Sequence, residues 1–172
     1  MQPVQTLEET GDTVTSVDVT SYEIIVGCAD AKVRRYDLRN GFLVTDLVGQ
    51  HPVTSVAVSA DSASLLVNLC QGDPLRLFDK ASGELLQEFS GHSHPSNIRI
   101  DAVLDHSNQS VLCGSEDGFV YVWDLLTAGV TAKLPHGQER ATVTSLSHHH
   151  EQPRLVTAAR ADLFFWEKKD DK

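Results

Sequence analysis

The chain has 172 residues, of which 41% are hydrophobic, and this supplies enough apolar surface for one domain with a sizeable core. Its formal net charge of −10 repels a phosphate backbone and argues against direct binding of nucleic acid. No apolar run approaches the roughly 20 residues of a membrane-spanning helix, and the N-terminal residues lack the features of a secretory signal. We therefore expect a cytoplasmic protein, with the nucleus as a second location, whose partners are proteins and neither nucleic acid nor membranes.

A stretch of strand-forming residues that ends in an aromatic and an acidic residue recurs four times. The copies read GCADAKVRRYD to Asp37, LCQGDPLRLFD to Asp79, GSEDGFVYVWD to Asp124 and AARADLFFWE to Glu167. Their final acidic residues are separated by 42, 45 and 43 residues. This period is typical of four-stranded propeller blades, so the sequence predicts an all-β array of about four such units.

Each repeat offers candidates for four strands, taken here in chain order. The innermost strands are predicted at 14–17 and 53–56 (VTSV), at 98–100 (IRI) and at 143–146 (VTSL). Apolar second strands follow at 24–26, 65–67, 111–113 and 155–157, the third strands end at the acidic residues, and GFLVTDL, GELLQEF and GVTAKL are candidates for outer strands. The predicted repeats are residues 9–48, 49–90, 91–134 and 135–167, with a stray outer strand at 2–8 and a solvated tail at 168–172.

The best-preserved copy is GSEDGFVYVWDL, residues 114–125. Asp117 and Gly118 tolerate the unusual backbone angles of a tight hairpin turn. Val120, Val122 and Trp123 then form a β-branched and aromatic strand. We therefore expect a β-hairpin here, with its turn at Asp117-Gly118.

These motifs identify the chain as similar to WD-repeat β-propeller proteins over essentially its whole length, as a single domain spanning residues 1–172. Gly91-His92 and Trp123-Asp124 match the pair that brackets one repeat in that family, and Gly49-Gln50-His51 and His136-Gly137 are looser versions of its first half. More narrowly, QPVQTL, VRRYDLRNG, LRLFDKASGELLQEFSGH and GSEDGFVYVWDL resemble the second half of longer members of the family.

The resemblance implies a structural network in each blade, in which a His, a Ser or Thr, the turn Asp and the strand Trp are hydrogen-bonded. In the third repeat the matching residues are His92, Cys113, Asp117 and Trp123, with Cys113 where a hydroxyl is expected. The other repeats contribute Asp30, Tyr36, Phe78 and Trp166, and the fourth has Arg160 at the turn. We assign these residues structural rather than catalytic roles, because a repeated motif reports the stacking of units.

Four repeats are few for a propeller of this kind, so closure of the ring is a separate question. One possibility is an open or strained arc with an apolar face at each end, stabilised by a partner or by self-association through open blade edges. The other is a ring that closes on itself, with residues 3–8 supplying the missing outer strand of the last blade. We favour the open arc, that is, a partial propeller.

The sequence offers little for catalysis or metal binding. Consecutive strand residues point to opposite faces, so His148, His149 and His150 are better interpreted as a turn at a blade rim than as a metal site. The three cysteines, Cys28, Cys70 and Cys113, lie in apolar strand-like contexts and are expected to be buried reduced thiols. There is no phosphate loop, nucleophile elbow or dinucleotide fingerprint. We predict no catalytic, cofactor-binding or metal-binding residues and no cofactor, and the protein-binding residues stay unassigned.

The function that this combination favours is a non-catalytic scaffold whose rim loops bind proteins. The family resemblance implies an adaptor that assembles components of a mitogen-activated protein kinase cascade. The alternative that it implies is a spliceosome-associated protein in pre-mRNA splicing. Two other hypotheses remain: a fragment without independent activity, and a small metal-dependent hydrolase using His148–His150 or His92 with Asp117.

Overall fold

The structure is a computed structural model in which residues 6–72, 74–137 and 141–167 are described. Within these ranges the chain forms fifteen strands and no α-helix, and the strands form four antiparallel sheets. The all-β array of four blades predicted from the repeats is confirmed. Helices that could span a membrane are absent from the part of the chain that the structure describes.

Each blade is made of consecutive strands, and three blades have four strands while the last has three. The strands of the first two blades are β1 (Val14–Val19), β2 (Glu23–Cys28), β3 (Lys32–Asp37), β4 (Leu43–Leu47), β5 (Val53–Val58), β6 (Ser64–Leu69), β7 (Leu75–Asp79) and β8 (Leu85–Phe89). Those of the last two are β9 (Ala102–Leu104), β10 (Ser110–Gly114), β11 (Phe119–Asp124), β12 (Val130–Pro135), β13 (Ser145–His148), β14 (Arg154–Ala159) and β15 (Asp162–Glu167).

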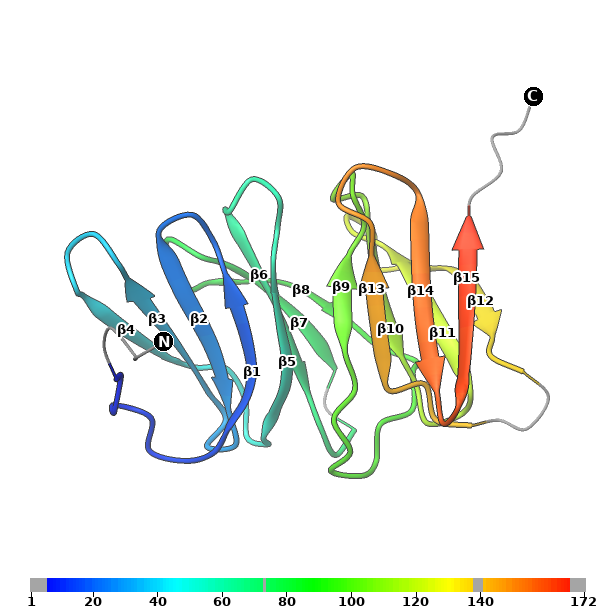
Figure 1. Cartoon of the computed structure of the whole chain (residues 1–172), viewed down its shortest axis with the longest axis horizontal. Coiled ribbons are helices and arrows are strands. Elements are labelled where there is room, and N and C mark those ends of the chain that lie inside the picture. Colours follow the sequence, from blue (N-terminus) through cyan, green and yellow to red (C-terminus); the bar gives the residue numbers. More distant parts are fainter. Residues whose placement is uncertain (1–5, 73, 138–140, 168–172) are drawn as a thin grey trace, which may run out of the picture.

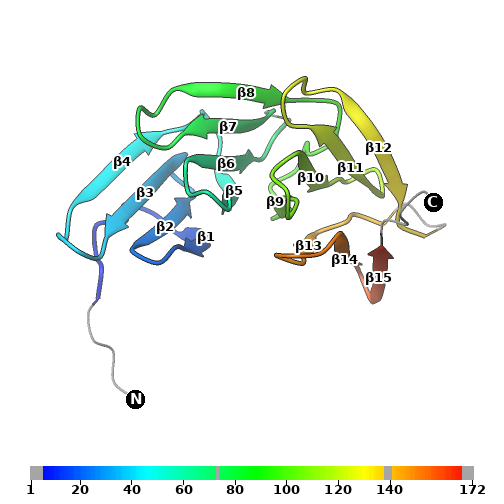
Figure 2. The same ribbon diagram turned by 90° about the horizontal axis from the view of Figure 1, so that it is seen from above.

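The blades follow one another along an open arc (Figure 1). Figure 2 shows β1, β5, β9 and β13 on the inner side of the arc, with β4, β8 and β12 on its outer side. The first and last blades stand at opposite ends and do not meet (Figures 1 and 2). The arrangement is therefore the partial propeller that the repeat count favoured, with one terminal face on the first blade and one on the last.

The hairpin predicted at residues 114–125 is formed by β10 and β11. Its register pairs Ser110 with Asp124 and Gly114 with Val120. Gly118 adopts a positive φ of 85°, as the tight turn requires. The apolar second strands and the outer strands predicted for the first three repeats are likewise present. The second strands are buried along nearly their whole length, whereas the outer strands are mostly exposed.

The hydrophobic core lies between the blades. One buried cluster joins the first and second blades, a second joins the second and third, and a third joins the third and fourth. Hydrogen bonds between inner strands add to this packing. The amide of Val56 donates to Ser16 Oγ at 3.1 Å, and the amide of Ala102 donates to Ser55 Oγ at 2.9 Å. Each blade is therefore held mainly by its neighbours in the chain.

The innermost strand of the third blade is not where the sequence predicted it. Residues 98–100 are not in a strand, and β9 begins at Ala102. The carbonyl of Ile98 faces His94 Nε2 at 2.7 Å, and that of Ile100 accepts from Asn68 Nδ2 at 3.0 Å. Because these two carbonyl groups interact with side chains, they do not form backbone hydrogen bonds to a neighbouring strand in the described residues, and residues 98–100 lie outside the sheet.

The N-terminal strand predicted at residues 2–8 falls partly on residues outside the described ranges, as does the tail at 168–172. Thr6 to Glu8 are described and are not in a strand. Leu7 packs on the first blade, against the cluster of Val26, Cys28 and Tyr36. In the described residues it therefore covers part of the first blade's terminal face.

Candidate functional site: a cleft between the third and fourth blades

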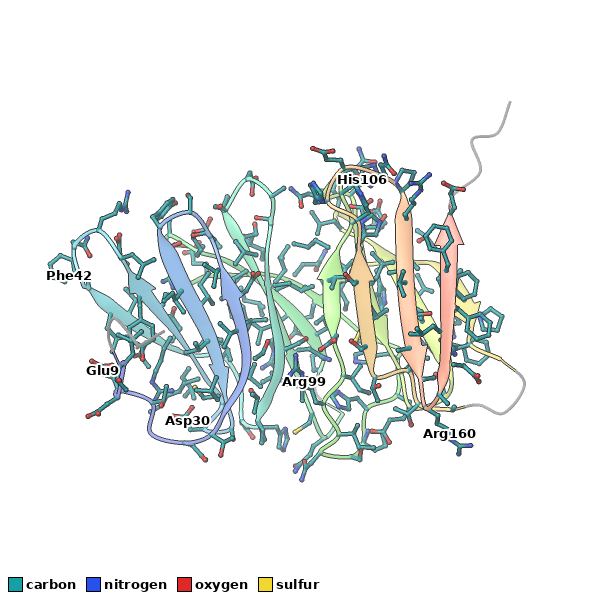
Figure 3. All side chains as sticks on the ribbon, viewed as in Figure 1. Glu9, Asp30, Phe42, Arg99, His106 and Arg160 are labelled. Atoms are coloured by element: carbon teal, nitrogen blue, oxygen red, sulfur yellow. The ribbon has the colours of Figure 1, made fainter. Side chains whose placement is uncertain are left out.

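A cleft of about 660 Å³ lies between the third and fourth blades. Its apolar wall combines residues of the second, third and outer strands of the two blades, and its rim is polar. The apolar residues are Leu112, Val122, Ala132, Leu134, Leu155 and Trp166, and the polar rim includes Asp105, His106, Gln109, His148 and Glu167. Figure 3 places His106 at this rim, at the opposite end of the blades from Arg160. An apolar wall with a polar rim is the usual chemistry of a binding site.

The cleft has a counterpart between the first and second blades, and the comparison explains its size. That counterpart is lined by the equivalent residues Arg35, Leu65 and Phe78, yet its volume is only about 30 Å³. Arg35 reaches across it to the carbonyl of Lys80, whereas the shorter Val122 stands at the same repeat position in the third blade. The fourth blade also has no outer strand in the described residues. Both differences leave space open.

The outer edge of β15 borders this region. In the described part of the chain β15 pairs only with β14, from Arg154 opposite Glu167 to Ala159 opposite Asp162. Alternate residues of β15 point in opposite directions, so Trp166 lines the cleft while Phe165 is 64% exposed on the other face. The free edge presents backbone N–H and C=O groups with which an extended peptide can pair.

Two histidine rings stack at the rim of the cleft. The rings of His106 and His148 are parallel, with centroids 5.5 Å apart. His148 Nδ1 lies 2.7 Å from the carbonyl oxygen of His149, and the buried Nδ1 of His106 has no hydrogen-bond partner. The stacked rings therefore form part of the polar rim beside the apolar wall.

The residues assigned to the third-blade network lie together but have other partners. Trp123 is fully buried and its Nε1 donates to the carbonyl of Ser90 at 3.0 Å. Asp117 Oδ2 accepts from the hydroxyl of Tyr121 at 2.7 Å, and neither ring nitrogen of His92 has a hydrogen-bond partner. The His92 ring packs edge-on against Trp123, with centroids 5.6 Å apart. His92 is therefore linked to Tyr121 and Trp123 by ring packing and not by a chain of hydrogen bonds.

Cys113 lies on the neighbouring strand of the same blade and is fully buried. Its Sγ accepts from Asn68 Nδ2 at 3.5 Å, and burial raises the pKa of its thiol. Cys28 and Cys70 are also buried, so the predicted burial of all three cysteines is confirmed. Thiols in such surroundings are poor nucleophiles.

The stability of the protein is expected to fall between about pH 6.5 and 4 because of His92. Burial lowers the pKa of its imidazole from 6.5 to about 4, with a further lowering from nearby His94. Since the unfolded chain takes up the proton first as pH falls, the neutral ring contributes fully above pH 6.5, and about 3 kcal/mol is lost by pH 4. Urea unfolding of the wild type and of His92→Leu at several pH values measures this.

The variant should show a shallower decline in unfolding free energy across that window. Carboxylates such as Asp30, whose pKa is lowered by its hydrogen bond to Arg34, titrate in both proteins and cancel in the comparison. Parallel pH profiles for the two proteins would show that His92 is protonated equally in the folded and unfolded states.

In the first blade, Asp30 forms an ion pair with Arg34 at 2.7 Å instead of contacting the aromatic residue of its strand. Tyr36 is buried on the terminal face and its hydroxyl has no hydrogen-bond partner. In the second blade, Phe78 packs at the edge of the core between the first two blades. Asp30, Tyr36 and Phe78 therefore stand at the repeat positions of the predicted network, but no hydrogen-bonded network joins them in the described part of the chain.

The fourth blade contains a connected set of three residues, of which the sequence pattern assigned only Trp166 to a structural network. Trp166 Nε1 donates to Thr157 Oγ1 at 2.9 Å, and His136 Nε2 lies 3.2 Å from the carbonyl of Thr157. Thr157 and His136 are buried. The signal was available, since His136 precedes the first strand of the fourth repeat and Thr157 supplies the hydroxyl that Cys113 lacks.

The histidine run at 148–150 forms no metal centre in the described residues, where no group of three or more His, Cys, Asp or Glu side chains converges. His148 ends β13 and stacks on His106, while the rings of His149 and His150 stack on each other at 4.7 Å. His92 and Asp117 both contact Tyr121: the His92 ring lies against the Tyr121 ring, and Asp117 accepts a hydrogen bond from the Tyr121 hydroxyl.

Comparisons with known proteins agree with this architecture. The model of the WD domain, G-beta repeat, matches residues 83–124. WD repeat domain-containing protein 83 of Rattus norvegicus is 39% identical over 168 residues, covering 98% of this chain and 52% of the relative. The protein of the same name from Danio rerio is 41% identical, covering 96% and 51%. The chain thus spans about half the length of the curated relatives it matches.

Among solved structures, the computationally designed Ika4 protein matches with a TM-score of 0.77 and 22% identity, covering 97% of this chain and 98% of that one. The designed Ika8 protein matches with a TM-score of 0.76 and 21% identity, covering 94% and 48%. At these identities the likeness shows the fold alone. The resemblance to WD-repeat propeller proteins, and more narrowly to WD repeat domain-containing protein 83, is confirmed. This family is generally non-catalytic, and its propellers generally mediate protein–protein interactions.

Proposed function

From its similarity to WD-repeat propeller proteins, we propose that this chain is a non-catalytic scaffold that binds an extended segment of a partner protein in the cleft between its third and fourth blades. The observation that carries the proposal is the cleft itself, which combines an apolar wall with the free edge of β15. An extended peptide can pair with that edge while alternate side chains enter the cleft. Scaffolding then acts by raising the local concentration of bound partners.

The partners we propose are components of a mitogen-activated protein kinase cascade, in the cytoplasm. This follows from the narrower sequence resemblance, since WD repeat domain-containing protein 83 is also called mitogen-activated protein kinase organizer 1. A second candidate is association with the spliceosome in the nucleus, which the same resemblance supports. The acidic net charge of −10 favours protein partners with basic surfaces in either case.

Replacing Ala132 by arginine is expected to weaken partner binding by about tenfold or more. Ala132 lies on β12 and lines the cleft, so the long charged side chain would occupy the space that a peptide needs. Affinity capture from cell lysate with quantitative mass spectrometry, followed by calorimetry on the purified partner, measures the loss.

Ala81→Arg is the matched control, because Ala81 is exposed in a turn of the second blade, outside the cleft. Enrichment of kinase-cascade proteins by the wild type and by the control supports the first candidate, and enrichment of splicing factors supports the second. Equal capture by all three proteins would place binding elsewhere on the surface.

A further inference from the structure

The terminal face of the first blade carries valines that are buried at the equivalent positions of the second blade. Val53 is fully buried, Val56 is 7% exposed, and both pack against the first blade, with Val58 beside them. The same positions of the VTSV repeat are occupied in the first blade by Val14, Val17 and Val19, which are 42%, 57% and 61% exposed. We call this surface, with Val14, Val17 and Val19, the front face. It carries the same apolar residues that a neighbouring blade covers in the second blade.

The terminal face of the fourth blade shows the same contrast on the opposite side. Four residues before the final acidic residue, the first three blades have Val33, Leu75 and Val120, all fully buried against the next blade. The fourth blade has Leu163 there, and it is 74% exposed. Its neighbours Val156 and Phe165 are 39% and 64% exposed. This surface is the back face.

The internal interfaces show what fits each face. In the three contacts between blades in the described residues, the back of one blade packs on the front of the next through a seam of apolar residues. Hydrogen bonds between inner strands also join the first blade to the second and the second to the third. Ser145 of the fourth blade stands at the repeat position of Ser16 and Ser55, whose hydroxyls accept an amide of the following blade, and its own hydroxyl donates to Asp101 Oδ2 of the third blade at 2.6 Å. The part of the front face that Leu7 leaves uncovered, with Val14, Val17 and Val19, is therefore the natural complement of the exposed back face, and a second copy of the chain supplies one.

We propose that two copies of this chain associate head to tail, the back face of each covering the front face of the other. Figure 2 shows both end blades bordering the same open side of the arc, so a second arc can engage both ends together. Each contact joins a back face to a front face, and a two-fold axis relates the two contacts, which closes the assembly at two copies instead of growing a filament. Each of the two contacts repeats the arrangement of the blade interfaces within the chain. Each contact removes one front face and one back face from water.

Size-exclusion chromatography with light scattering, over a series of protein concentrations, tests this directly. The wild type is expected at twice the 18.8 kDa mass of one chain. Val17→Lys on the front face and Leu163→Lys on the back face should each abolish the dimer, because each variant lacks a complementary face in both contacts. Leu126→Lys is the control, since Leu126 is 83% exposed in a turn away from both faces. Circular dichroism verifies that all variants are folded.

Mixing the two variants gives the sharper outcome. The intact back face of Val17→Lys can cover the intact front face of Leu163→Lys, so the mixture should form a dimer although each component alone stays monomeric. A monomeric wild type, a wild type that grows into larger polymers, or a mixture that remains monomeric would overturn the proposal. Binding of other proteins in the cleft is unaffected by these results, so the two proposals can fail separately.

Discussion

Replacing Trp123 by alanine is expected to lower the free energy of unfolding by about 3–5 kcal/mol. The indole is fully buried between the second and third blades and contacts the rings of Phe89, His92 and Tyr121 at centroid distances of 6.0, 5.6 and 5.6 Å. Its removal leaves a cavity and also an unpaired carbonyl at Ser90, to which Nε1 donates. Chemical denaturation followed by circular dichroism measures the loss.

Leu126→Ala provides the comparison for Trp123→Ala. Leu126 is 83% exposed, so its truncation should change the unfolding free energy by no more than about 0.5 kcal/mol. A loss below about 1 kcal/mol for Trp123→Ala would mean that the second and third blades do not depend on this contact.

Replacing Gly114 by alanine is expected to cost about 1–3 kcal/mol or more, by forcing the third and fourth blades apart. A Cβ at Gly114 would lie 2.1 Å from the carbonyl oxygen of Val143, which is backbone and cannot rotate away. The strain should appear as a lower midpoint of denaturation and as faster amide hydrogen exchange in β13 to β15.

The matched control for this substitution is Gly129→Ala. A Cβ there would meet only Thr127 Oγ1 at 3.4 Å, and Gly129 has no positive φ. The control should leave hydrogen exchange of the fourth blade unchanged. Equal midpoints of denaturation and equal hydrogen exchange in the two glycine variants would contradict the close approach of Gly114 to Val143.

The repeat architecture could be predicted because it rests on local patterns. Alternating apolar residues, turn residues such as Asp117-Gly118 and the acidic strand ends recur at one period, and each reflects a backbone requirement of a short strand or turn. The innermost strand of the third blade escaped prediction because residues 98–100 alternate like a strand. Their carbonyl groups are taken by Asn68 and His94, which come from other segments.

The cleft could not be predicted from the sequence pattern. It arises because the third blade has no long side chain at position 122 and the described part of the fourth blade has no outer strand. Val122 reads as an ordinary strand residue, and only the comparison with Arg35 in the first blade shows that a shorter side chain leaves space. The set of His136, Thr157 and Trp166 was closer to reach. Its residue types are visible in the sequence, but the motif is better preserved in the third repeat, where Cys113 stands in the place of the hydroxyl.

The central claim is that the cleft between the third and fourth blades binds a protein segment, and amide hydrogen exchange tests it most directly. Exchange should be measured on the chain alone and on the chain saturated with a partner captured by the wild type but not by Ala132→Arg. We expect slower exchange in β15 (Asp162–Glu167) of the saturated chain, because its outer edge would pair with the bound segment. Unchanged exchange in β15 with protection confined to the first two blades would contradict it.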